Sequence, residues 1–516
     1  MRIIPANCPF ILLTLVWMAS LSGGSPEARA EDQPIPFLKT EHFDRDPGWD
    51  NSVNRVKRES KRVARHDFGY QESNHAGEKA GEMGGVVWRS LAPAYYGKMI
   101  KPLTFDDAMS CSGTLSLVQT PESIMGFQTG STIFVGFFNH QVQGWRPVNF
   151  LGFRLEGYNQ PDGALLEVSY GTSRWTAGGA FVNTSGDSQE KLVRDLDQSQ
   201  LRRVAPDATK HKWEFRYDPK GADGNGQMIF IFDGSRTVFN LSGEHRRQGA
   251  TFDRCGIFAA SLPGNEMTAY FDDMTINGER EDFSADPGWD GQGNHAEIKD
   301  PAAYGENEFG YSTTHGGEMG GRFWRVQEPE YKGYCGDDIG RLTFENKLFA
   351  RGKMRIPRFC ADSGVHFGWF NSKEQGWPPK NFVGVYLDSY TPAGRFATPM
   401  YGTSHAGFVE NPGGGKRIRS AAHGEPKPLF YPDGRVYDWT LEYDPQANSG
   451  GGTITFTLGS ETATLNLAPG LKAEGATFDR FGMFNMQDNN GKDCVLYLDD
   501  LSYTTAAGDR RGVDAR

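Results

Sequence analysis

Short runs of alternating apolar and polar residues recur along the chain, with turn residues between them. Residues 453–458 place Ile, Phe and Leu on one side and three threonines on the other, which is the pattern of a half-buried strand. Residues 439–443 and 213–217 alternate in the same way. Clusters rich in Gly and Asn at 221–226 and 448–452 follow these runs and predict hairpin turns. The pattern contains no long amphipathic helix after the first 30 residues, and it predicts an all-β protein.

The same ordered series of motifs occurs twice, which shows that the chain contains two copies of one module. Matching segments begin at Phe43 and Phe283, Phe68 and Phe309, Gly81 and Gly317, Leu103 and Leu342, Phe138 and Phe370, Tyr170 and Tyr401, Tyr217 and Tyr443, and Gly249 and Gly475. The offset between copies falls from 240 to 226 along this series, so insertions are small. Each copy is much longer than a solenoid repeat and is long enough to fold as a domain.

The repeat defines the expected domains. We predict copy 1 at residues 43–279 and copy 2 at 283–505, each an antiparallel two-sheet β-sandwich. A signal peptide is predicted at 1–30, a linker at 31–42 and a polar tail at 506–516. Only a few residues separate the copies, so we expect them to touch.

The first 30 residues have the features of a secretory signal. Arg2 precedes an apolar stretch at 10–21, and Ala28-Arg29-Ala30 matches a cleavage site. The apolar stretch is shorter than the roughly 20 residues of a membrane span, and no later stretch is apolar enough to be one. The sequence therefore predicts a secreted or periplasmic protein with no transmembrane segment.

Charge and cysteine content narrow the possible partners. Removing Arg2, Arg29 and Glu27 with the signal takes away two positive charges and one negative, and changes the net charge from −11 to −12. An acidic chain without a long basic run is a poor match for nucleic acid. Five cysteines remain after cleavage, none at matching positions of the two copies. We expect most of them to be free and buried, with room for one bridge in copy 2.

The closing strands carry a resemblance to a known superfamily. Residues 252–258 are followed by 269–274, which end in Asp-Asp and an apolar residue, and copy 2 repeats this at 478–484 and 496–501. These motifs resemble those of the concanavalin A-like (laminin G-like) jelly-roll superfamily. The resemblance implies a two-sheet sandwich, but it does not select a function, because the superfamily includes lectins, binding modules, hydrolases and lyases.

One predicted site is a structural Ca²⁺, which related jelly-roll binding modules often hold. The first and last strands of a sandwich are often neighbours, so the Asp-Pro-Gly-Trp-Asp motif and the closing Asp-Asp could meet. Asp44, Asp46 and Asp273 would then supply hard oxygen ligands. Ser284 stands in place of Asp44 in copy 2, and the alternative is an ordinary turn with hydrogen-bonded carboxylates.

A second predicted site lies on one sheet face. In residues 150–156 the apolar side chains share one phase, and Gly152, Arg154 and Glu156 share the other. Rings that stack on a sugar, together with amides and charges that bond its hydroxyls, would make this face a ligand site; the alternative is a solvated sheet face. The predicted ligand-binding residues are Trp145, Asn139, Arg154 and Glu167 in copy 1 and Trp377, Asn371, Tyr386, Asp388 and Trp369 in copy 2.

Acid/base chemistry has its own candidates. The glycine-rich segments at 75–85 and 315–321 contain His and Glu and lead into Trp-Arg. Glu156, Glu82, His75 and Arg89 are the catalytic candidates, and the alternative is a tight loop with a structural Glu–Arg pair. The chain lacks Glu-x-Asp-x-x-Glu and Gly-x-Ser-x-Gly.

Three functions remain open from the sequence. The first is a secreted carbohydrate-binding or adhesion protein, in which two modules give avidity on a polysaccharide or glycan surface. The second is a polysaccharide hydrolase or lyase with its active site in one copy. The third is a structural module of an envelope or matrix. Whether the chain is an enzyme is not decided by these patterns.

Overall fold

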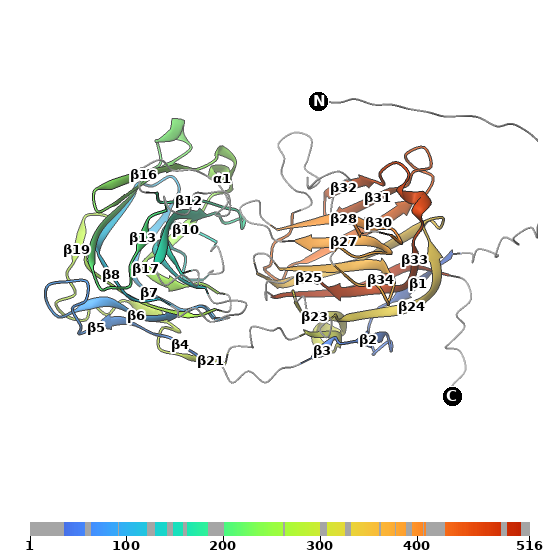
Figure 1. The fold of residues 1–516 in the computed structure, drawn as a ribbon, viewed down its shortest axis with the longest axis horizontal. Coiled ribbons are helices and arrows are strands. Elements are labelled where there is room, and N and C mark those ends of the chain that lie inside the picture. Colours follow the sequence, from blue (N-terminus) through green and yellow to red (C-terminus); the bar gives the residue numbers. More distant parts are fainter. Residues whose placement is uncertain are drawn as a thin grey trace, which may run out of the picture.

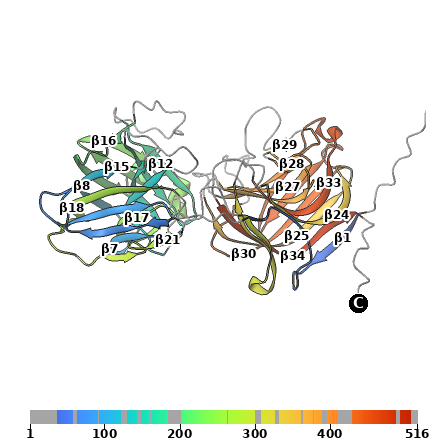
Figure 2. The ribbon, with the colours of Figure 1, turned by 60° about the horizontal axis from the view of Figure 1, so that its bottom comes forward.

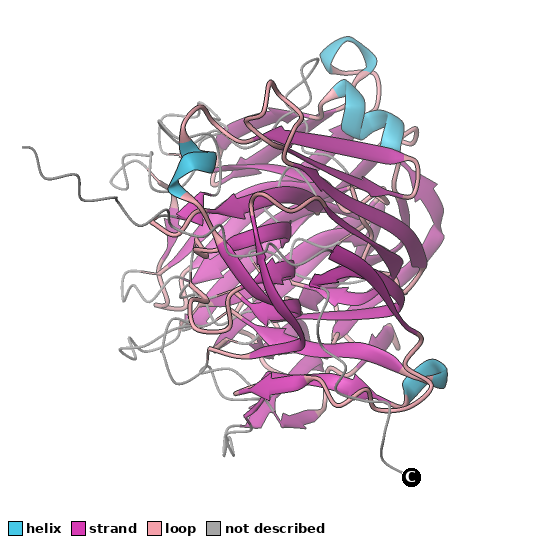
Figure 3. Ribbon diagram, turned by 90° about the vertical axis from the view of Figure 1, so that its right-hand side faces the viewer, coloured by secondary structure: helices cyan, strands magenta, loops and turns pink. Residues whose placement is uncertain are grey.

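Antiparallel strands make up nearly all of the described protein. The computed structural model describes residues 36–56, 63–90, 92–120, 130–141, 148–157, 163–183, 201–261, 264–299, 307–325, 332–360, 363–376, 378–388, 395–405, 407–408, 429–486 and 493–506. Within these ranges, helix is confined to α1 (Gly243–Gln248) and to short 3-10 turns at Ala222–Gly224, Thr314–Gly316 and Leu471–Glu474 (Figure 3). No helix in these ranges is long and apolar enough for a membrane span. The predicted all-β class is confirmed, while the predicted signal peptide lies outside the described residues.

The first unit, on the left of Figure 1, is a sandwich of two antiparallel sheets. One sheet runs in the order β16 (Ser235–Asn240), β15 (Gln227–Phe232), β14 (Lys210–Asp218), β8 (Met109–Gln119), β18 (Glu266–Ile276), β6 (Glu82–Trp88) and β5 (Asp67–Gln71), with β19 (Glu279–Glu281) paired to β18. The other runs in the order β12 (Ala177–Phe181), β11 (Ala164–Gly171), β10 (Phe150–Gly157), β9 (Ser131–Phe138), β17 (Thr251–Ala259), β7 (Tyr95–Thr104) and β20 (Asp290–Gln292), with β13 (Arg203–Val204) paired to β11.

The second unit, on the right of Figure 1, repeats this plan. Its larger sheet runs in the order β3 (Arg55–Val56), β22 (Asn307–Ser312), β23 (Glu318–Trp324), β34 (Asp493–Ala506), β25 (Leu348–Phe359), β30 (Val436–Asp444), β31 (Thr453–Leu458) and β32 (Glu461–Asn466), with β1 (Pro36–Glu41) paired to β34. The facing sheet runs in the order β2 (Asp50–Ser52), β24 (Tyr334–Thr343), β33 (Thr477–Asn485), β26 (Gly364–Phe370), β27 (Phe382–Asp388), β28 (Phe396–Gly402) and β29 (Gly407–Phe408).

The predicted alternation matches the buried faces. In β31, Ile454, Phe456 and Leu458 are buried while the threonines between them are half-buried. The alternating aromatic residues of β14 and β30 are likewise buried in the cores of the two units. The predicted turns at 221–226 and 448–452 join β14 to β15 and β30 to β31. All five cysteines of the described chain are buried and unbridged.

The opening segment of each sequence copy packs in the other copy's sandwich. β1 runs antiparallel to β34, from Pro36 opposite Ala506 to Glu41 opposite Leu501 (Figure 2). β2 and β3 also join the second unit, through β24 and β22. Conversely β20, from the second copy, pairs with β7, and β21 (Glu297–Lys299) pairs with β4 (Val63–Arg65). The units that pack are therefore residues 63–299 and residues 36–56 with 307–506.

This exchange differs from the sequence boundaries of 43–279 and 283–505. Those boundaries describe the repeat, whereas strand pairing assigns the opening segments 36–56 and 281–299 to the opposite sandwich. The segment 31–42, predicted as a linker, contains β1. The first unit obtains its edge from β19, which follows β18 directly in a hairpin. In the second unit the N-terminal β1 pairs with β34 at the corresponding place.

Each opening segment is anchored by an aromatic ring and an ion pair. Phe43 is 2% exposed in the second core and Phe283 is 0% exposed in the first. Asp50 accepts a hydrogen bond from Arg480 at 2.6 Å, and its counterpart Asp290 accepts bonds from Arg254 at 2.7 and 2.9 Å. The two most similar repeat motifs, Asp-Pro-Gly-Trp-Asp and Gly-Ala-Thr-Phe-Asp-Arg, thus meet across the exchange.

The glycine-rich motifs receive the opening segments. A Cβ added at Gly81 would lie 1.9 Å from the carbonyl oxygen of Phe283, and one at Gly317 would lie 2.0 Å from that of Phe43. Both glycines have φ in the left-handed half of the map, at +110° and +119°, where side chains are strained. The repetition of this motif is therefore explained by backbone contact with the exchanged segment.

We expect the single substitutions Phe43→Ala and Phe283→Ala to distinguish this exchange from an arrangement in which each opening segment packs in the sandwich of its own copy. Removing a buried Phe side chain costs about 3–5 kcal/mol of unfolding free energy. F43A should speed hydrogen exchange in peptides from residues 307–506, and F283A should do so in peptides from 63–281. Hydrogen–deuterium exchange with mass spectrometry measures both. Loss of protection within 63–281 in the F43A protein would contradict the exchange.

Candidate functional site

The polar face predicted on β10 exists, and it is buried. Leu151, Phe153 and Leu155 lie in the core of the first unit, so Arg154 and Glu156 point to the opposite face of the sheet. Cross-strand pairing places Glu167 of β11 opposite Arg154 and Thr132 of β9 opposite Glu156. Arg154 is 2% exposed, Glu156 0% and Glu167 5%, so this is not a solvated sheet face.

These side chains form one ionic network with Arg89. Arg89 pairs with Glu156 and donates from Nε to the Thr132 hydroxyl at 2.8 Å. Thr132 donates to Oε2 of Glu156 at 2.9 Å. Arg154 lies 3.7 Å from Glu156 and donates from Nε to Glu167 at 3.1 Å. Both carboxylates are therefore engaged with guanidinium groups, which is the arrangement that a buried charge requires.

The same face of the second unit is aromatic. His366 stacks on Phe484 with ring centroids 4.7 Å apart and on Tyr386 at 5.1 Å. Burial, with a smaller contribution from nearby Arg325, lowers the pKa of His366 to about 3, so its ring is neutral near pH 7. The predicted ligand residues Tyr386 and Asp388 are each 5% exposed.

We expect Glu156→Ala to destabilise the first unit strongly. Removing one partner of a buried ion pair leaves an uncompensated charge and costs about 3–5 kcal/mol, here because Arg89 would lose its carboxylate. Urea unfolding monitored by hydrogen exchange of peptides from 63–299 measures the effect. Glu279→Ala is the matched control, since it breaks the exposed Lys98–Glu279 pair of the same unit and should cost less than about 1 kcal/mol. Equal effects of the two substitutions would contradict the structural role of the network.

The catalytic candidates Glu82 and His75 serve the glycine-rich loop. Glu82 is 0% exposed and accepts hydrogen bonds from the Ser73 hydroxyl and from the backbone N–H groups of His75 and Ala76, at 2.6, 2.8 and 2.6 Å. The His75 ring stacks on Tyr270 with centroids 4.3 Å apart. With three donors on its carboxylate, Glu82 closes the loop. It lies in the sheet beside the exchanged segment and is not joined to the Arg154 network.

The predicted asparagines and tryptophans have separate positions. Asn139 donates to the Thr251 hydroxyl at 3.0 Å and Asn371 donates to that of Thr477 at 3.3 Å, so each ties a turn to the next strand. Trp369 is 0% exposed, packs on Phe481 at 5.0 Å and lies in the core. This burial contradicts its predicted contact with a ligand, because its strand phase faces the opposite sheet. Trp145 and Trp377 lie outside the described residues.

The predicted calcium ligands are divided between the two units. Asp44 and Asp46 belong to the exchanged segment of the second unit, where Asp46 accepts the backbone N–H of Gly48 at 2.9 Å in a turn. Asp273 lies in the first unit and pairs with Arg280 at 3.0 Å. The described residues contain no group of three His, Cys, Asp or Glu side chains placed to hold a metal ion. Next to the opening motif of copy 1, His42 binds Asp500 of the closing Asp-Asp of copy 2 at 2.9 Å.

Asp272, next to Asp273, is a buried carboxyl with an unusual pKa. It is 4% exposed, and burial raises its pKa from 3.8 to about 6. The folded protein therefore binds more protons than the unfolded chain between about pH 4 and pH 6. In that window the free energy of unfolding of the first unit falls as pH rises.

We expect Asp272→Asn to remove this pH dependence. The amide keeps the acceptor that binds the Asp273 backbone N–H at 2.6 Å, and it needs no charge to be buried. The gain should be about 1–3 kcal/mol at pH 7 and near zero at pH 4. Thermal unfolding at both pH values measures it, with the exposed Asp67→Asn as control. A gain of equal size at both pH values would show that the carboxyl charge is not the cause.

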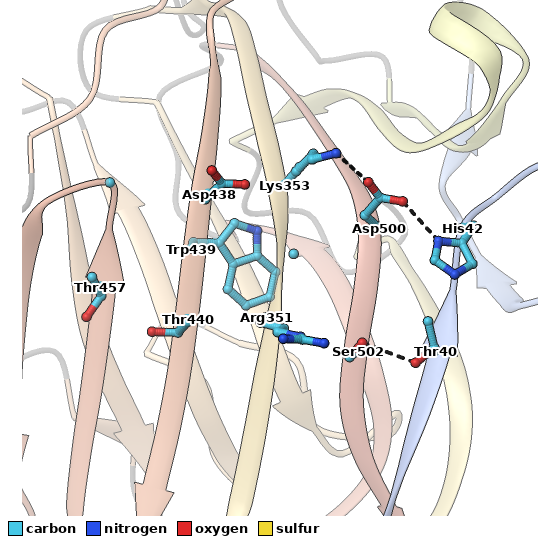
Figure 4. A pocket seen from close by; sticks show the side chains of 12 residues that line it. Thr40, His42, Arg351, Lys353, Asp438, Trp439, Thr440, Thr457, Asp500 and Ser502 are labelled. Carbon is cyan, nitrogen blue, oxygen red and sulfur yellow. Dashed lines mark hydrogen bonds and ion pairs between the residues drawn. The ribbon is translucent and has the colours of Figure 1, made fainter.

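A groove on the outer face of the second unit's larger sheet was not predicted. It has a volume of about 650 Å³ and is lined by residues of β1, β34, β25, β30 and β31, including Thr40, His42, Arg351, Lys353, Asp438, Trp439, Thr440, Thr457, Asp500 and Ser502 (Figure 4). Its lining residues come from both ends of the sequence and from copy 2. Strand periodicity marks Arg351, Lys353, Asp438, Thr440 and Thr457 as outward-facing and Trp439 as inward-facing, but it does not bring β1 beside β34.

A cleft between the units was also not predicted. Its volume is about 710 Å³, and it is lined by Pro93, His140, Gln141, Val148, Asn149, Ser173, Trp175 and Gln292 of the first unit and by Pro432 and Asp433 of the second. The Arg395 guanidinium of the second unit lies 4.6 Å from the Trp175 ring centroid and donates to the Trp175 carbonyl at 3.4 Å. Trp175 has a φ of 65°, which is rare for a bulky residue. This contact between the units therefore holds a strained tryptophan at the cleft.

Comparisons with known proteins give similarities of fold. No family model matches the chain, and no curated protein matches it. Similar solved structures include mouse laminin alpha1 chain domains LG4-5, with 11% identity over 84% of this chain and 92% of that one and a TM-score of 0.22. Peanut lectin has 14% identity over 38% and 89%, and the botulinum neurotoxin serotype G binding domain 7% over 87% and 94%, each with a TM-score of 0.24. We take no superfamily, ligand or activity for this chain from these proteins.

Proposed function

We propose that this protein binds carbohydrate without transforming it, in the cleft between its two units. The observation that carries the proposal is the combination of Trp175 with planar polar side chains around one hollow. An indole ring can stack on the apolar face of a sugar, and the amides of Gln141, Asn149 and Gln292 can each donate to and accept from neighbouring hydroxyls. The volume of about 710 Å³ lies within the range of pockets that hold small ligands.

The charged groups near the cleft favour binding over catalysis. His140 pairs with Asp253 at 2.5 Å, and Asp433 accepts two bonds from Nε of Arg435, at 2.8 and 3.0 Å. A glycoside hydrolase needs two carboxyl groups with distinct protonation states flanking the substrate. The carboxylates predicted for that role, Glu156 and Glu82, are instead held by arginine or by loop donors. These contacts weigh against the hydrolase or lyase alternative.

A ligand in this cleft would touch both units. Trp175 and Arg395 join the units at its edge, and Arg174 lies 5.6 Å from the Tyr431 ring on the same side. Ligand binding would therefore also stabilise the arrangement of the two sandwiches relative to each other. With the predicted signal peptide, we place this binding outside the cytoplasm, on a secreted or periplasmic glycan.

We expect Trp175→Ala to weaken binding of neutral oligosaccharides at least tenfold. Loss of an aromatic ring that stacks on the ligand costs about 2 kcal/mol or more. Isothermal titration of the mature protein against neutral glucan, galactan and xylan oligosaccharides measures the change. Met99→Ala is the control, because Met99 is 66% exposed on the same unit and lies outside the cleft.

Three outcomes would count against the proposal. Unchanged affinity of W175A would remove the cleft as the binding site. Shortening of the oligosaccharides during titration would make the protein an enzyme. Absence of binding by the unaltered protein would favour the structural envelope or matrix alternative.

A further inference from the structure

The groove of the second unit is crossed by a straight row of hydroxyl groups with one arginine in it. Thr40 of β1 lies opposite Ser502 of β34, which lies opposite Arg351 of β25. Arg351 lies opposite Thr440 of β30, and Thr440 opposite Thr457 of β31. With neighbouring strands about 4.8 Å apart, the row spans about 19 Å across five strands. An extended polymer lying across the strands would meet Thr40, Arg351, Thr440 and Thr457, while Ser502 is 4% exposed and binds the Thr40 hydroxyl at 3.1 Å.

Arg351 is the cation of this groove that is open to an anion. Lys353 and His42 both bind Asp500, His42 at 2.9 Å. Arg351 is exposed, and no carboxylate of the described residues lies within ion-pair distance of its guanidinium. In Figure 4 it extends along the hydroxyl row, apart from both Asp438 and Asp500. A planar guanidinium matches the geometry of a carboxylate or sulfate group with two parallel hydrogen bonds.

The floor of the groove contains a buried polar group. Gly352 faces the core there, where an added Cβ would lie 2.5 Å from Leu501 and 3.2 Å from the Trp439 ring. Trp439 is 2% exposed, and its indole N–H has no hydrogen-bond partner among the described residues. The matching Trp213 of the first unit donates to the Thr114 carbonyl at 3.3 Å. The Trp439 indole N–H of the second unit is therefore a buried donor beside the groove, whereas the matching N–H of the first unit is bonded to its own sheet.

The first unit has the same row with different chemistry. Its positions are Arg280, Thr275, Ser112, Glu214 and Ile231, in the same cross-strand order. Serine stands at the Arg351 position, and a carboxylate and an apolar side chain replace Thr440 and Thr457. An anionic ligand would be repelled by Glu214. The cation of this row, Arg280, already pairs with Asp273 at 3.0 Å, so the first unit's row is less suited to an anion and supplies an internal control.

We propose that this groove binds acidic polysaccharide, with Arg351 pairing to a carboxylate or sulfate and the hydroxyl row bonding the sugars. The proposal rests on the proposed carbohydrate binding but uses a different surface from the cleft. The net charge of −12 after signal removal opposes general attraction of polyanions, so binding would report this local site. Thr40 and His42 come from the exchanged segment, and the groove is therefore complete only after the N-terminal strand has joined the second unit.

The test is surface plasmon resonance of the mature protein on immobilised polygalacturonate, dextran sulfate and neutral dextran. We expect the unaltered protein to bind at least one acidic polymer, and the two acidic surfaces distinguish carboxylate from sulfate recognition. Arg351→Ala should weaken that binding at least tenfold, while Ser112→Ala, at the matching position of the first unit, should leave it unchanged. W175A should also bind the acidic polymer normally.

Any other result overturns either the groove proposal or the cleft proposal, and the two failures can be told apart. If R351A binds as tightly as the unaltered protein, or if no acidic polymer binds, the groove proposal is wrong, whatever the cleft does with neutral oligosaccharides. If acidic binding depends on Arg351 while W175A has no effect on neutral ligands, the groove stands and the cleft proposal fails. Melting curves confirm that each variant is folded, because Arg351 is exposed and its removal should not destabilise the sandwich.

Discussion

Seating of the opening segment against a glycine is the contact on which both sandwiches depend. A sandwich edge left without its strand exposes unpaired backbone groups and an unfilled core. Phe43 and Phe283 fill that space, with their carbonyl groups lying where a side chain at Gly317 or Gly81 would be. The ion pairs from Arg480 and Arg254 to the last aspartate of the motif fix the segment's direction. Ring, carbonyl and carboxylate together explain why these motifs are among the most similar parts of the two copies.

Much of the fold could be predicted because strand periodicity reflects burial directly. The alternation in β31, β14 and β30 identified buried faces, and the phase of β10 separated Phe153 in the core from Arg154 outside it. The exchange could not be predicted from one sequence, because both copies carry the same opening motif. The opening segment of either copy has the residues needed to pack in either sandwich. Burial of Glu156 was equally hidden, because strand phase says which face a side chain points to and not what covers that face.

The site residues show the same division. The loop around Glu82 was predictable, because its donors His75 and Ala76 are neighbours in sequence. The structural Glu–Arg pair predicted with it is not formed by Glu82, because Arg89 pairs with Glu156 of another strand. The cleft and the groove are built from distant parts of the chain. The cleft brings together Trp175 and Asp433, and the groove brings together Thr40 and Thr457. The two copies have kept their cores and diverged on their outer faces. Arg154 and Glu167 correspond to Tyr386 and Thr398, and Arg351 to Ser112, so one scaffold presents two different surfaces.

The exchange also sets an order in time. Synthesis proceeds from the N-terminus, so β1 is made long before its partner β34. Until then Phe43 and Trp49, both almost fully buried in the finished protein, have no core to enter. A chain cut short anywhere in the second copy would keep that segment exposed to proteases and to other unfinished chains. The pairing of β1 with β34 therefore forms only after both copies have been synthesised, and a protease that cleaves exposed segments would remove chains that lack it.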